Sequence, residues 1–335
     1  MLAAGLGTRL RPLTGTEPKP ALPVAGMPVA GRTLALLAKA GCETAAVNLH
    51  HLGGRLRAVL GDSVAGMPLV YSEELEVQGT LGALWPLRDF CAAADLLLVI
   101  NGDSLCRWPL GRLLRAHRGG GAAATLLLSR RADPAQFGGG VGVTPDGDIV
   151  TFDAAVPAAG ATVARRRVFA GAHVFAPSLL AGLTAGPADF VAGLYKPLLA
   201  RGERIAGLET GRRWQDLGTP ERYRRAVLDH LFRGRPWRRR WLAPDAQVAP
   251  SARLSRVAIE RGARVEAGAR LRRTLVLPGA RVGRAAVLAR CLVGFGVQVP
   301  AGAEVSGQLI TPAAEDLLPG RGSRMGDLVF TPLDG

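Results

Sequence analysis

The sequence has no apolar run near the roughly 18 residues that a membrane-spanning helix needs, although 48% of its 335 residues are hydrophobic. Arg9 and Arg11 interrupt the N-terminal segment before the apolar stretch of a secretory signal could form. The four cysteines, Cys42, Cys91, Cys106 and Cys291, are scattered without a CxxC pair. This spacing argues against a metal site or a disulfide framework. These absences predict a cytoplasmic protein with reduced thiols and no membrane association.

Lysine and aromatic side chains are both scarce. Only three of the 42 basic residues are lysines, and Phe, Trp and Tyr together make up 5% of the chain. The formal net charge of +15 makes nucleic acid or another polyanion a partner to consider. The preference for arginine over lysine, however, runs through the whole sequence, and binding through base stacking needs aromatic platforms. We therefore expect no nucleic-acid partner.

Up to about residue 229, short apolar strands alternate with amphipathic helical stretches. This order is typical of an α/β domain with a mainly parallel mixed sheet. Residues 33–41 and 220–232 are predicted helices, and residues 44–49 and 95–103 are predicted strands. Ligands of open α/β sheets bind outside the carboxyl ends of the strands, so Asp103, at the end of "DLLLVINGD", is a candidate catalytic carboxylate.

Further along the chain the hydrophobic period changes to about six residues. The recurring aliphatic side chains are Val248, Leu254, Ile259, Val265, Leu271, Val276, Val282, Val287, Val293, Val299 and Val305, often with a small residue two places before. This period fits neither a helix nor a simple strand, and it predicts a parallel β-helix. Irregular strands of a sandwich would not keep the same phase over so many positions. We predict a first domain over 1–232, a linker over 233–243, a β-helix over 244–310 and a tail over 311–335.

The stretch "LAAGLGTRLRPLTGTEPKPALPVAG", residues 2–26, has the composition of an anion cradle. It lacks the GxxxxGK[ST] and GxGxxG patterns of common phosphate-binding loops. Gly5 and Gly7 predict a turn after a strand end, and Thr8 and Arg9 would open a helix whose backbone N–H groups could face a phosphate. Lys19 adds a mobile positive charge. A glycine turn with solvated basic residues is the alternative, but a lysine between two prolines favours a function.

This stretch resembles the signature of the sugar-1-phosphate nucleotidyltransferases. The segments "QGTLGAL", "VINGDSL", "VFAGAHVF" and "WQDLGTPERY" resemble later segments of that family in the same order. The resemblance covers nearly all of residues 1–230. It implies a Rossmann-like nucleotidyltransferase domain followed by a left-handed β-helix of hexapeptide repeats.

The resemblance also implies a reaction. A sugar 1-phosphate would attack the α-phosphorus of a nucleoside triphosphate, giving a nucleotide-sugar and pyrophosphate in the presence of Mg²⁺. The attacking phosphate oxygen is already ionised at neutral pH, so no general base is required. The difficulty is repulsion between two anions, which positioning and fixed positive charge relieve.

The family's site residues carry over onto matching positions of this chain. Those implied to hold the nucleotide are Ala3, Ala4, Gly5, Gly7, Thr8 and Arg9, with Gln78 and Gly79 beside the base. A glycine at 79 would leave room for the base ring. Those implied to contact the sugar phosphate are Lys19, Gly142 and Gly171, where a side chain at 171 would collide with the sugar.

Arg9, Lys19 and Asp103 are the implied catalytic residues. Arg9 would meet the charge of the departing pyrophosphate, and Lys19 would bridge the attacking and α-phosphates. Asp103 and Asp216 would bind Mg²⁺, which prefers hard oxygen ligands. A structural capping role is the alternative for these two carboxylates. His50 and His51 stand next to each other and would face opposite ways on a strand, so a structural role is favoured over a metal site.

The sequence departs from the family in two places. Met1 falls inside the first central strand, so either the true start lies upstream or the strand is trimmed. The region "VTFDAAVPAAG" lacks the acidic residue and lysine that many relatives place beside the sugar. The overall arrangement resembles the mannose-1-phosphate guanylyltransferase and MurNAc-1-phosphate uridylyltransferase branches more than the glucose-1-phosphate thymidylyltransferase branch. The resemblance therefore favours mannose 1-phosphate and GTP as the expected substrates.

Several alternatives stay open at this point. One is uridylyl or thymidylyl transfer to MurNAc, GlcNAc or glucose 1-phosphate. Another is a regulatory subunit that binds a nucleotide-sugar without catalysis, although Asp103, Asp216 and Lys19 are all present. Acyl transfer by the β-helix is disfavoured, because all five histidines precede it. The β-helix is expected to pack on the catalytic domain or to build a homo-oligomer.

Overall fold

The computed structural model describes residues 1–153, 161–235, 237, 239–313 and 322–333. The chain forms two compact units. The first unit consists of Met1–Gly5 and Ala30–Gln215, and the second consists of Leu6–Val29 and Asp216–Gly335. Most of the predicted anion cradle therefore folds in one unit with the C-terminal part of the chain.

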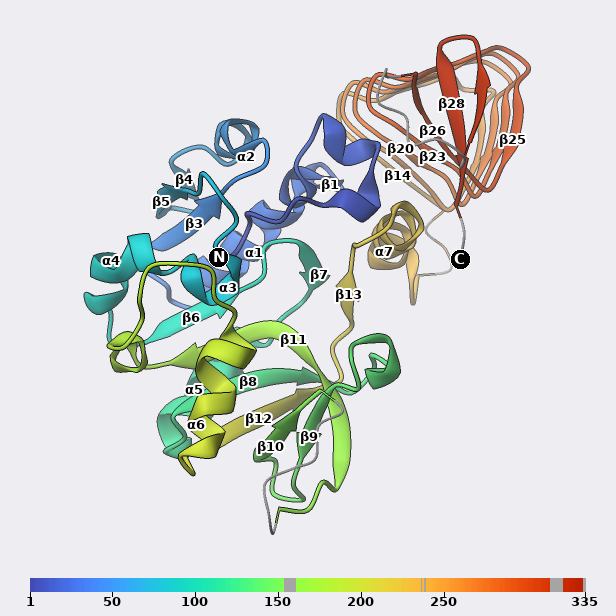
Figure 1. The fold of residues 1–335 in the computed structure, drawn as a ribbon. Helices are drawn as coiled ribbons and strands as arrows, with labels where there is room; N and C mark the ends of the chain where they lie inside the picture. The colour runs from blue at the N-terminus through green and yellow to red at the C-terminus, as the bar shows by residue number, and fades with distance from the viewer. Residues whose placement is uncertain (154–160, 236, 238, 314–321, 334–335) are drawn as a thin grey trace. The chain divides into compact units, whose positions relative to one another are not determined.

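A mixed sheet forms the centre of the first unit (Figure 1). Its strands follow the order β10 (Ile149–Phe152), β9 (Val141–Val143), β11 (Arg165–Phe175), β8 (Ala124–Ser129) and β12 (Ile205–Thr210), with β6 (Leu97–Ile100) paired to β11. Strand β11 is antiparallel to β6, β8 and β9, whereas β12 is parallel to β8. The predicted α/β class with a mixed sheet is confirmed, but this sheet is not mainly parallel, because β12–β8 is the one parallel pair among its described strands.

A second group of strands holds the start of the chain. Strand β3 (Ala45–Leu49) is parallel to β5 (Met67–Glu73), and β4 (Ser63–Val64) joins β5 antiparallel. Residues 1–3 hydrogen-bond on both sides: the Asn48 N–H donates to Met1 O, and the Leu2 N–H donates to Ile100 O at 2.8 Å. The first residues thus join β3 to β6.

Helices and short strands complete the first unit. The α-helices are α1 (Val29–Lys39), α2 (Gly53–Leu60), α3 (Gly79–Gly82), α4 (Arg88–Ala92), α5 (Leu110–Gly120) and α6 (Lys196–Ala200). Strand β7 (Ser104–Cys106) pairs with β13 (Trp214–Asp216), at whose end the chain enters the second unit. Every residue of β3 and β8 is buried, as expected for strands that are covered on both faces.

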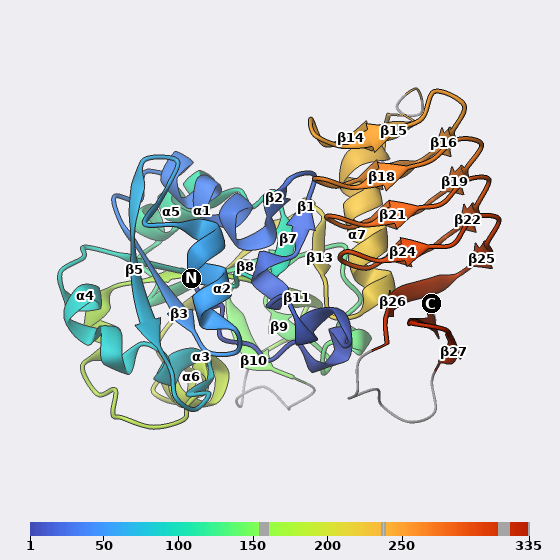
Figure 2. The ribbon, with the colours of Figure 1, turned by 90° about the horizontal axis from the view of Figure 1, so that it is seen from above.

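The second unit contains the left-handed β-helix (Figures 1 and 2). One of its parallel sheets is β14 (Arg240–Leu242), β17 (Val257–Ile259), β20 (Leu275–Val276), β23 (Leu292–Val293) and β26 (Gln308–Pro312). The second is β15 (Gln247–Val248), β18 (Arg264–Val265), β21 (Arg281–Val282) and β24 (Gln298–Val299). The third is β16 (Arg253–Ser255), β19 (Arg270–Arg272), β22 (Val287–Ala289) and β25 (Glu304–Ser306).

Each coil of the β-helix has 17 residues, because Val248 pairs with Val265, Val265 with Val282, and Val282 with Val299. Inward side chains therefore follow steps of six, five and six. The predicted inward position of Val287 is wrong: Val287 is 37% exposed, and Leu288, 1% exposed, pairs with Leu271 and Val305 inside the coil. A shift of one residue along a strand moves a side chain to the opposite face.

The tail, for which the sequence predicted no structure, closes the β-helix over its described residues. Strand β28 (Leu328–Pro332) pairs antiparallel with β26 and with β27 (Ser323–Met325). The buried Phe330 belongs to the hydrophobic core of the coils. This hairpin covers the last coil with antiparallel strands and so protects the open sheet edge.

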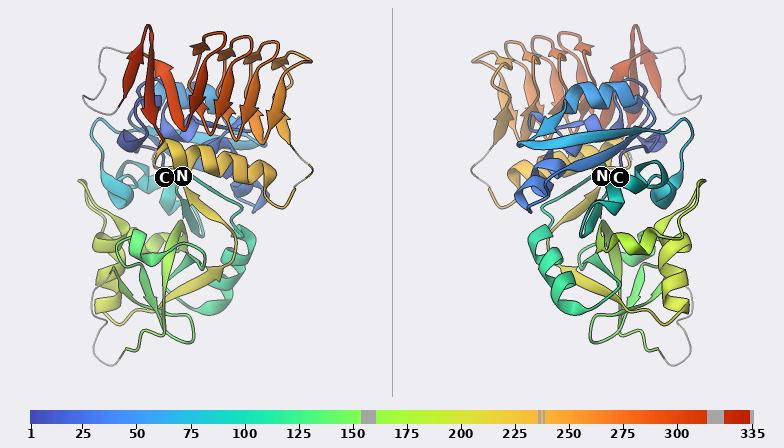
Figure 3. Two further views of the ribbon diagram at one scale, coloured as in Figure 1. Left: turned by 90° about the vertical axis from the view of Figure 1, so that its right-hand side faces the viewer. Right: turned by 90° about the vertical axis from the view of Figure 1, so that its left-hand side faces the viewer.

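Helix α7 (Pro220–Phe232) packs along the stack of coils (Figure 3). It contacts β17, β20 and β23. Thr219 caps its N-terminus by accepting a hydrogen bond from the Arg222 N–H, and Pro220 occupies the first helical position. Arg224, buried on the helix, donates to Arg273 O at 2.5 Å and so ties α7 to the β-helix.

Candidate functional site

Three cations surround Asp216 in the second unit. Lys19 Nζ lies 3.2 Å from Asp216 Oδ1, and Arg222 Nη1 lies 3.0 Å from Oδ2. Arg9 Nη2 lies 4.0 Å from the same Oδ2. We call these four residues the Asp216 cluster. Three positive charges face one negative charge in the cluster, so it favours an anionic ligand.

Lys19 is the most buried cation of the Asp216 cluster. Its side chain is 8% exposed, whereas that of Arg9 is 69% exposed. Buried lysines are rare unless they are paired, and the ion pair with Asp216 meets that need. The flanking prolines hold the short 3₁₀ turn Lys19–Ala21 in place. Arg9 keeps the freedom to reach outward.

Gly7 and Thr14 fold the cradle back onto Lys19. Gly7 has φ +62°, and a Cβ there would lie 3.1 Å from Thr14 Cγ2 and 3.4 Å from Lys19 Cβ. The Thr14 hydroxyl donates to Gly7 O at 2.8 Å. Thr14 was missed in the sequence, although it lies within the quoted signature. A side chain at position 7 would strain the backbone and crowd Lys19.

The helix expected to open at Thr8 and Arg9 is only one 3₁₀ turn, Thr8–Leu10. Proline at position 12 explains this difference, because the residue before a proline is disfavoured in the α conformation. Arg11 accordingly has φ −56° and ψ 143°. The predicted row of helix N–H groups is therefore wrong beyond this turn, and the positive charge of the cradle comes mainly from side chains.

Arg222 and Gly218 are site residues that the sequence reasoning missed. Both lie in the segment "WQDLGTPERY", which supplied Asp216 alone. A Cβ on Gly218 would lie 2.6 Å from Asp216 Oδ2 and 2.9 Å from Arg9 Nη2. The absence of a side chain there lets the carboxylate and the guanidinium approach each other. Because both residues lie in this motif, the motif alone could have marked them as candidate site residues.

A buried hydrogen-bond chain in the first unit joins the start of the cradle to the predicted base-binding segment. The Ala3 N–H donates to Asn48 Oδ1 at 2.6 Å, and Asn48 Nδ2 donates to Glu74 Oε1 at 2.6 Å. Glu74 Oε2 accepts from the Gln78 N–H at 2.9 Å. Asn48 is 4% and Glu74 7% exposed. Ala4 is also buried, whereas Gly5 is exposed at the end of this segment.

Gly79 is fixed by packing against residue 188. It has φ +73°, and a Cβ there would lie 2.4 Å from Ala188 O. The Leu81 N–H donates to the same carbonyl at 2.9 Å, and the Ala188 N–H donates to Gln78 O at 2.9 Å. Packing against this carbonyl by itself accounts for the glycine, and the idea that the glycine leaves room for a base ring stays a prediction. Contact of Gln78 and Gly79 with the base stays a prediction.

Gly171 occupies an irregular position of β11. The register with β8 shifts between Phe169 and His173, and Gly171 has φ +71°. A Cβ there would lie 2.7 Å from Asn101 Nδ2, and Gly171 O accepts from the Asn101 N–H at 2.8 Å. The expected collision is thus with Asn101, whose backbone leads to Asp103. Sugar contact by Gly171 stays a prediction.

Gly142 lies inside the sheet of the first unit. A Cβ on it would lie 2.5 Å from Thr151 Cγ2 and 3.0 Å from Val163 Cγ2. Packing alone accounts for a glycine there. Its proposed contact with the sugar phosphate is not needed to explain the residue.

The predicted metal ligands fit Mg²⁺ in their chemistry. Asp103 follows β6 in the first unit and accepts a hydrogen bond from Ser104 Oγ at 3.3 Å, whereas Asp216 belongs to the second unit. Among the residues that the structure describes, no group of three or more His, Cys, Asp or Glu side chains could hold a metal ion. Mg²⁺ usually binds one or two carboxylates and completes its shell with phosphate oxygens and water. Each aspartate, taken by itself, is therefore a chemically suitable ligand for Mg²⁺.

The Cys106 thiol and the His173 imidazole are buried, and neither suits acid–base chemistry at neutral pH. Burial raises the pKa of the Cys106 thiol to about 12, so it stays protonated and is a poor nucleophile. Burial lowers the pKa of His173 to about 3, so its imidazole is neutral. His50 Nδ1 lies 2.8 Å from Glu74 O, which agrees with a structural role.

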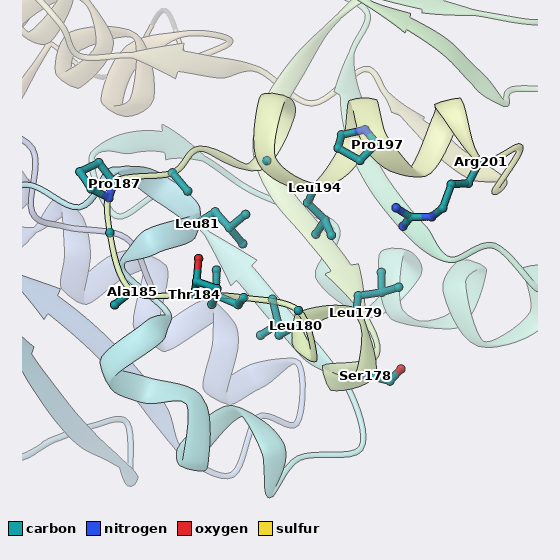
Figure 4. A pocket seen from close by; sticks show the side chains of 15 residues that line it. Leu81, Ser178, Leu179, Leu180, Thr184, Ala185, Pro187, Leu194, Pro197 and Arg201 are labelled. Carbon is teal, nitrogen blue, oxygen red and sulfur yellow. The ribbon is translucent and has the colours of Figure 1, made fainter.

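A pocket of about 710 Å³ opens in the first unit beside α3 (Figure 4). Its walls come from Leu81, from residues 178–180, 182–188 and 193–194, and from Pro197 and Arg201. None of the predicted site residues lines it. Arg201 is the one cationic residue among the described residues of its walls, so the pocket lacks the convergent cations that a triphosphate needs and is a poor candidate for the site.

The segment "VTFDAAVPAAG", which lacks the acidic residue and lysine of many relatives, is described only in part: its residues 154–160 lie outside the described residues. Within the described part of the chain, no helix is long and apolar enough to cross a membrane.

Known proteins are similar to this chain over most of its length. The nucleotidyl transferase family model matches residues 1–231, and the model for a GlmU-like C-terminal hexapeptide region matches residues 241–311. A mannose-1-phosphate guanylyltransferase of Mycobacterium tuberculosis (strain ATCC 25618 / H37Rv) is 33% identical, over 81% of this chain and 77% of that protein. The mannose-1-phosphate guanylyltransferase catalytic subunit beta of Drosophila pseudoobscura pseudoobscura is 28% identical, over 66% of this chain and 59% of that protein.

The crystal structure of HddC from Yersinia pseudotuberculosis superimposes with a TM-score of 0.55 at 20% identity. The match covers 68% of this chain and 97% of that chain. It supports the fold of the nucleotidyltransferase region.

Proposed function

Since the chain belongs to the nucleotidyl transferase family, we propose that it transfers GMP from GTP to mannose 1-phosphate and releases pyrophosphate. The observation that carries the proposal is the Asp216 cluster, in which Arg9, Lys19 and Arg222 converge within the family's sequence motifs. The names of the similar proteins from Mycobacterium tuberculosis and Drosophila support the choice of mannose 1-phosphate and GTP.

The reaction needs positive charge more than it needs a base. An oxygen of the sugar phosphate attacks the α-phosphorus, and the bond from the α-phosphorus to the oxygen that joins it to the β-phosphorus breaks, so that pyrophosphate leaves with that oxygen. Lys19 would exchange its contact with Asp216 for the attacking and α-phosphates, and Arg9 would follow the departing pyrophosphate. Fixed cations at these oxygens lower the repulsion between the two anions and stabilise the transition state.

Asp103 and Asp216 are the proposed Mg²⁺ ligands. The bound ion would neutralise part of the charge on the triphosphate. Ala3, Ala4, Gly5, Gly7 and Thr8 are the proposed nucleotide contacts on the basis of the motif, and Gln78 and Gly79 are the proposed contacts of the base. Chelation with EDTA should abolish activity, and added Mg²⁺ should restore it.

A substrate panel tests the proposal. Pyrophosphate release is measured for mannose, glucose, GlcNAc and MurNAc 1-phosphates with each of GTP, UTP, dTTP and ATP. The highest kcat/KM is expected for mannose 1-phosphate with GTP. A preference for UTP or dTTP would replace the assignment with uridylyl or thymidylyl transfer. No turnover of any pair, together with binding of a nucleotide-sugar, would support a regulatory subunit.

Lys19→Ala is the matched test of the Asp216 cluster, with Lys39→Ala as its control. Lys39 is an exposed lysine at the end of α1. Lys19→Ala should lower kcat about 100-fold or more, as expected for the loss of a cation at the reacting phosphates, and Lys39→Ala should match the wild type. Asp103→Asn should also reduce turnover sharply with the fold intact. Unchanged Mg²⁺-dependent activity of Asp103→Asn would remove Asp103 from the metal site.

Location and assembly belong to the same proposal. An enzyme that uses GTP and a sugar phosphate is expected in the cytoplasm, where both occur. The β-helix offers a surface through which copies of the chain could form a homo-oligomer, and sedimentation of the purified protein would determine the number of copies.

A further inference from the structure

A β-hairpin joins the predicted catalytic lysine to the β-helix within the second unit. Strands β1 (Pro23–Val24) and β2 (Met27–Pro28) pair antiparallel, directly after the turn that holds Lys19. Ala25 and Gly26 connect them with φ values of 52° and 77°. Two consecutive positive φ values are the signature of the tight turn that suits the twist of a hairpin. The hairpin has a fixed shape that can transmit support to Lys19.

The tip of the hairpin rests on the first two coils of the β-helix. The Gly26 N–H donates to Glu260 Oε2 at 2.9 Å. The Trp241 ring lies over the same glycine, because a Cβ on Gly26 would be 3.5 Å from its Cη2. Trp241 lies in β14 of the first coil, and Glu260 directly follows β17 at the start of the second coil.

Glu260 breaks the chemical pattern of the β-helix. It is 0% exposed, and the position 17 residues later, in the next coil, is Leu277, also 0% exposed. Burial of a carboxylate is costly unless it is hydrogen-bonded, so the β-helix alone would be expected to place an apolar residue here. The contact with the hairpin supplies the reason for an acid at this position.

Helix α7 supports the same hairpin from a second side. The hydroxyl of Tyr223, a fully buried residue, donates to Pro23 O at 2.6 Å. Three residues before Tyr223 the helix begins, just after Asp216, the partner of Lys19. Lys19 and Asp216 are therefore each continuous in sequence with a segment anchored on the β-helix.

We propose that the first two coils of the β-helix position the catalytic lysine, with Glu260 of the second coil as a positioning residue for the transfer reaction. This inference rests on the proposed function, because it assumes that Lys19 acts on the substrate phosphates. Glu260 acts through Gly26 and the hairpin and does not touch the substrate. Loss of its hydrogen bond lets the hairpin move, and small displacements of a catalytic group have large effects on rate.

Four variants of the full chain test this role in the pyrophosphate-release assay. Glu260→Leu removes the acceptor and installs the residue type that the next coil has at Leu277, whereas Glu260→Gln keeps an acceptor oxygen. Tyr223→Phe removes only a hydroxyl. Glu266→Ala is the matched control, because Glu266 Oε2 accepts the Arg284 N–H at 3.0 Å within the β-helix and does not contact the hairpin.

Glu260→Leu and Tyr223→Phe should each lower kcat about tenfold with a smaller change in the KM for GTP, the size expected for one lost hydrogen bond. Glu260→Gln should stay within about threefold of the wild type, and Glu266→Ala should equal it. In a Lys19→Ala background, Glu260→Leu should have no further effect on kcat. If Glu260→Leu cannot be purified folded, Tyr223→Phe carries the same comparison.

Hydrogen exchange gives a readout that does not depend on activity. Peptides covering residues 22–28 should exchange faster in Glu260→Leu than in Glu266→Ala. Equal kcat values for Glu260→Leu and the wild type, or effects of Glu260→Leu and Lys19→Ala that multiply, would overturn the positioning role. If Lys19→Ala itself keeps full activity, the proposed function of Lys19 fails, whereas faster exchange would still show that Glu260 supports the hairpin.

Discussion

Replacing Glu74 by alanine should weaken both the fold of the first unit and its affinity for the nucleotide. Glu74 accepts two hydrogen bonds, from Asn48 Nδ2 at 2.6 Å and from the Gln78 N–H at 2.9 Å. Glu74→Ala leaves both donors without their acceptor, at a cost of about 1–3 kcal/mol for a buried group. Asn48 is 4% exposed, whereas Gln78 is half-buried and can turn to water. The expected loss of unfolding free energy is therefore about 2–3 kcal/mol.

Thermal unfolding and steady-state kinetics measure the two effects. For a folding unit of this size, 2–3 kcal/mol corresponds to a fall in Tm of about 5–10 °C. The KM for GTP should rise about tenfold, because Ala3 and Gln78, at the two ends of the hydrogen-bond chain, are proposed nucleotide contacts. Glu73→Ala is the control. Glu73 is the exposed neighbour at the end of β5, and its loss should change stability by less than about 0.5 kcal/mol.

The outcomes separate stability from binding. A Tm for Glu74→Ala within about 2 °C of that for Glu73→Ala would refute the energetic argument. A lower Tm with an unchanged KM for GTP would show that the hydrogen-bond chain stabilises the fold without positioning the nucleotide.

Three further predictions concern pH, a glycine and the β-helix. Burial lowers the pKa of His173 to about 3, so between pH 3 and about 6.5 the unfolded chain binds more protons than the folded chain does. The free energy of unfolding should therefore fall by about 2 kcal/mol from pH 7.5 to pH 5. Urea unfolding of His173→Phe should show a smaller fall in this free energy over the same pH range. Gly79→Ala should destabilise the first unit by more than about 1 kcal/mol, because its Cβ would lie 2.4 Å from Ala188 O; an unchanged Tm would contradict this. Leu288→Ala should cost about 2–4 kcal/mol, and Val287→Ala less than about 1 kcal/mol; equal costs in denaturant unfolding would contradict the register of the coils.

Elements with a strong local pattern could be predicted from the sequence. Helix α7 has the predicted bounds, Pro220–Phe232, because a threonine cap, a first-turn proline and a regular apolar face all agree. The β-helix was recognised from its period. Its phase was misplaced at Val287 because Leu288, beside it, is equally apolar, and only the 17-residue coil length distinguishes the two.

The candidate site was predictable only where a motif contains all of its parts. Asp216 and Lys19 came from two quoted segments, and their 3.2 Å contact joins residues that are 197 positions apart. Glu74 and Asn48 gave no signal, because a buried hydrogen-bond chain has no sequence period. The helix predicted from Thr8 is only one turn long, because Pro12 disfavours the α conformation at Arg11. The domain boundaries at 232, 243 and 310 stay predictions.

Long-range contacts explain why the segment Leu6–Val29 folds in one unit with the C-terminal part of the chain. Leu6–Val29 has little regular structure of its own, and an isolated hairpin is unstable in water. Its stability must come from partners that bind its backbone and its charge: Tyr223 at Pro23, Glu260 at Gly26 and Asp216 at Lys19. All three partners lie more than 190 residues later in the chain. The cradle can therefore reach its final shape only after α7 and the first two coils have folded. Any change that loosens these coils should appear as a loss of catalytic rate before it appears as a loss of the nucleotidyltransferase fold.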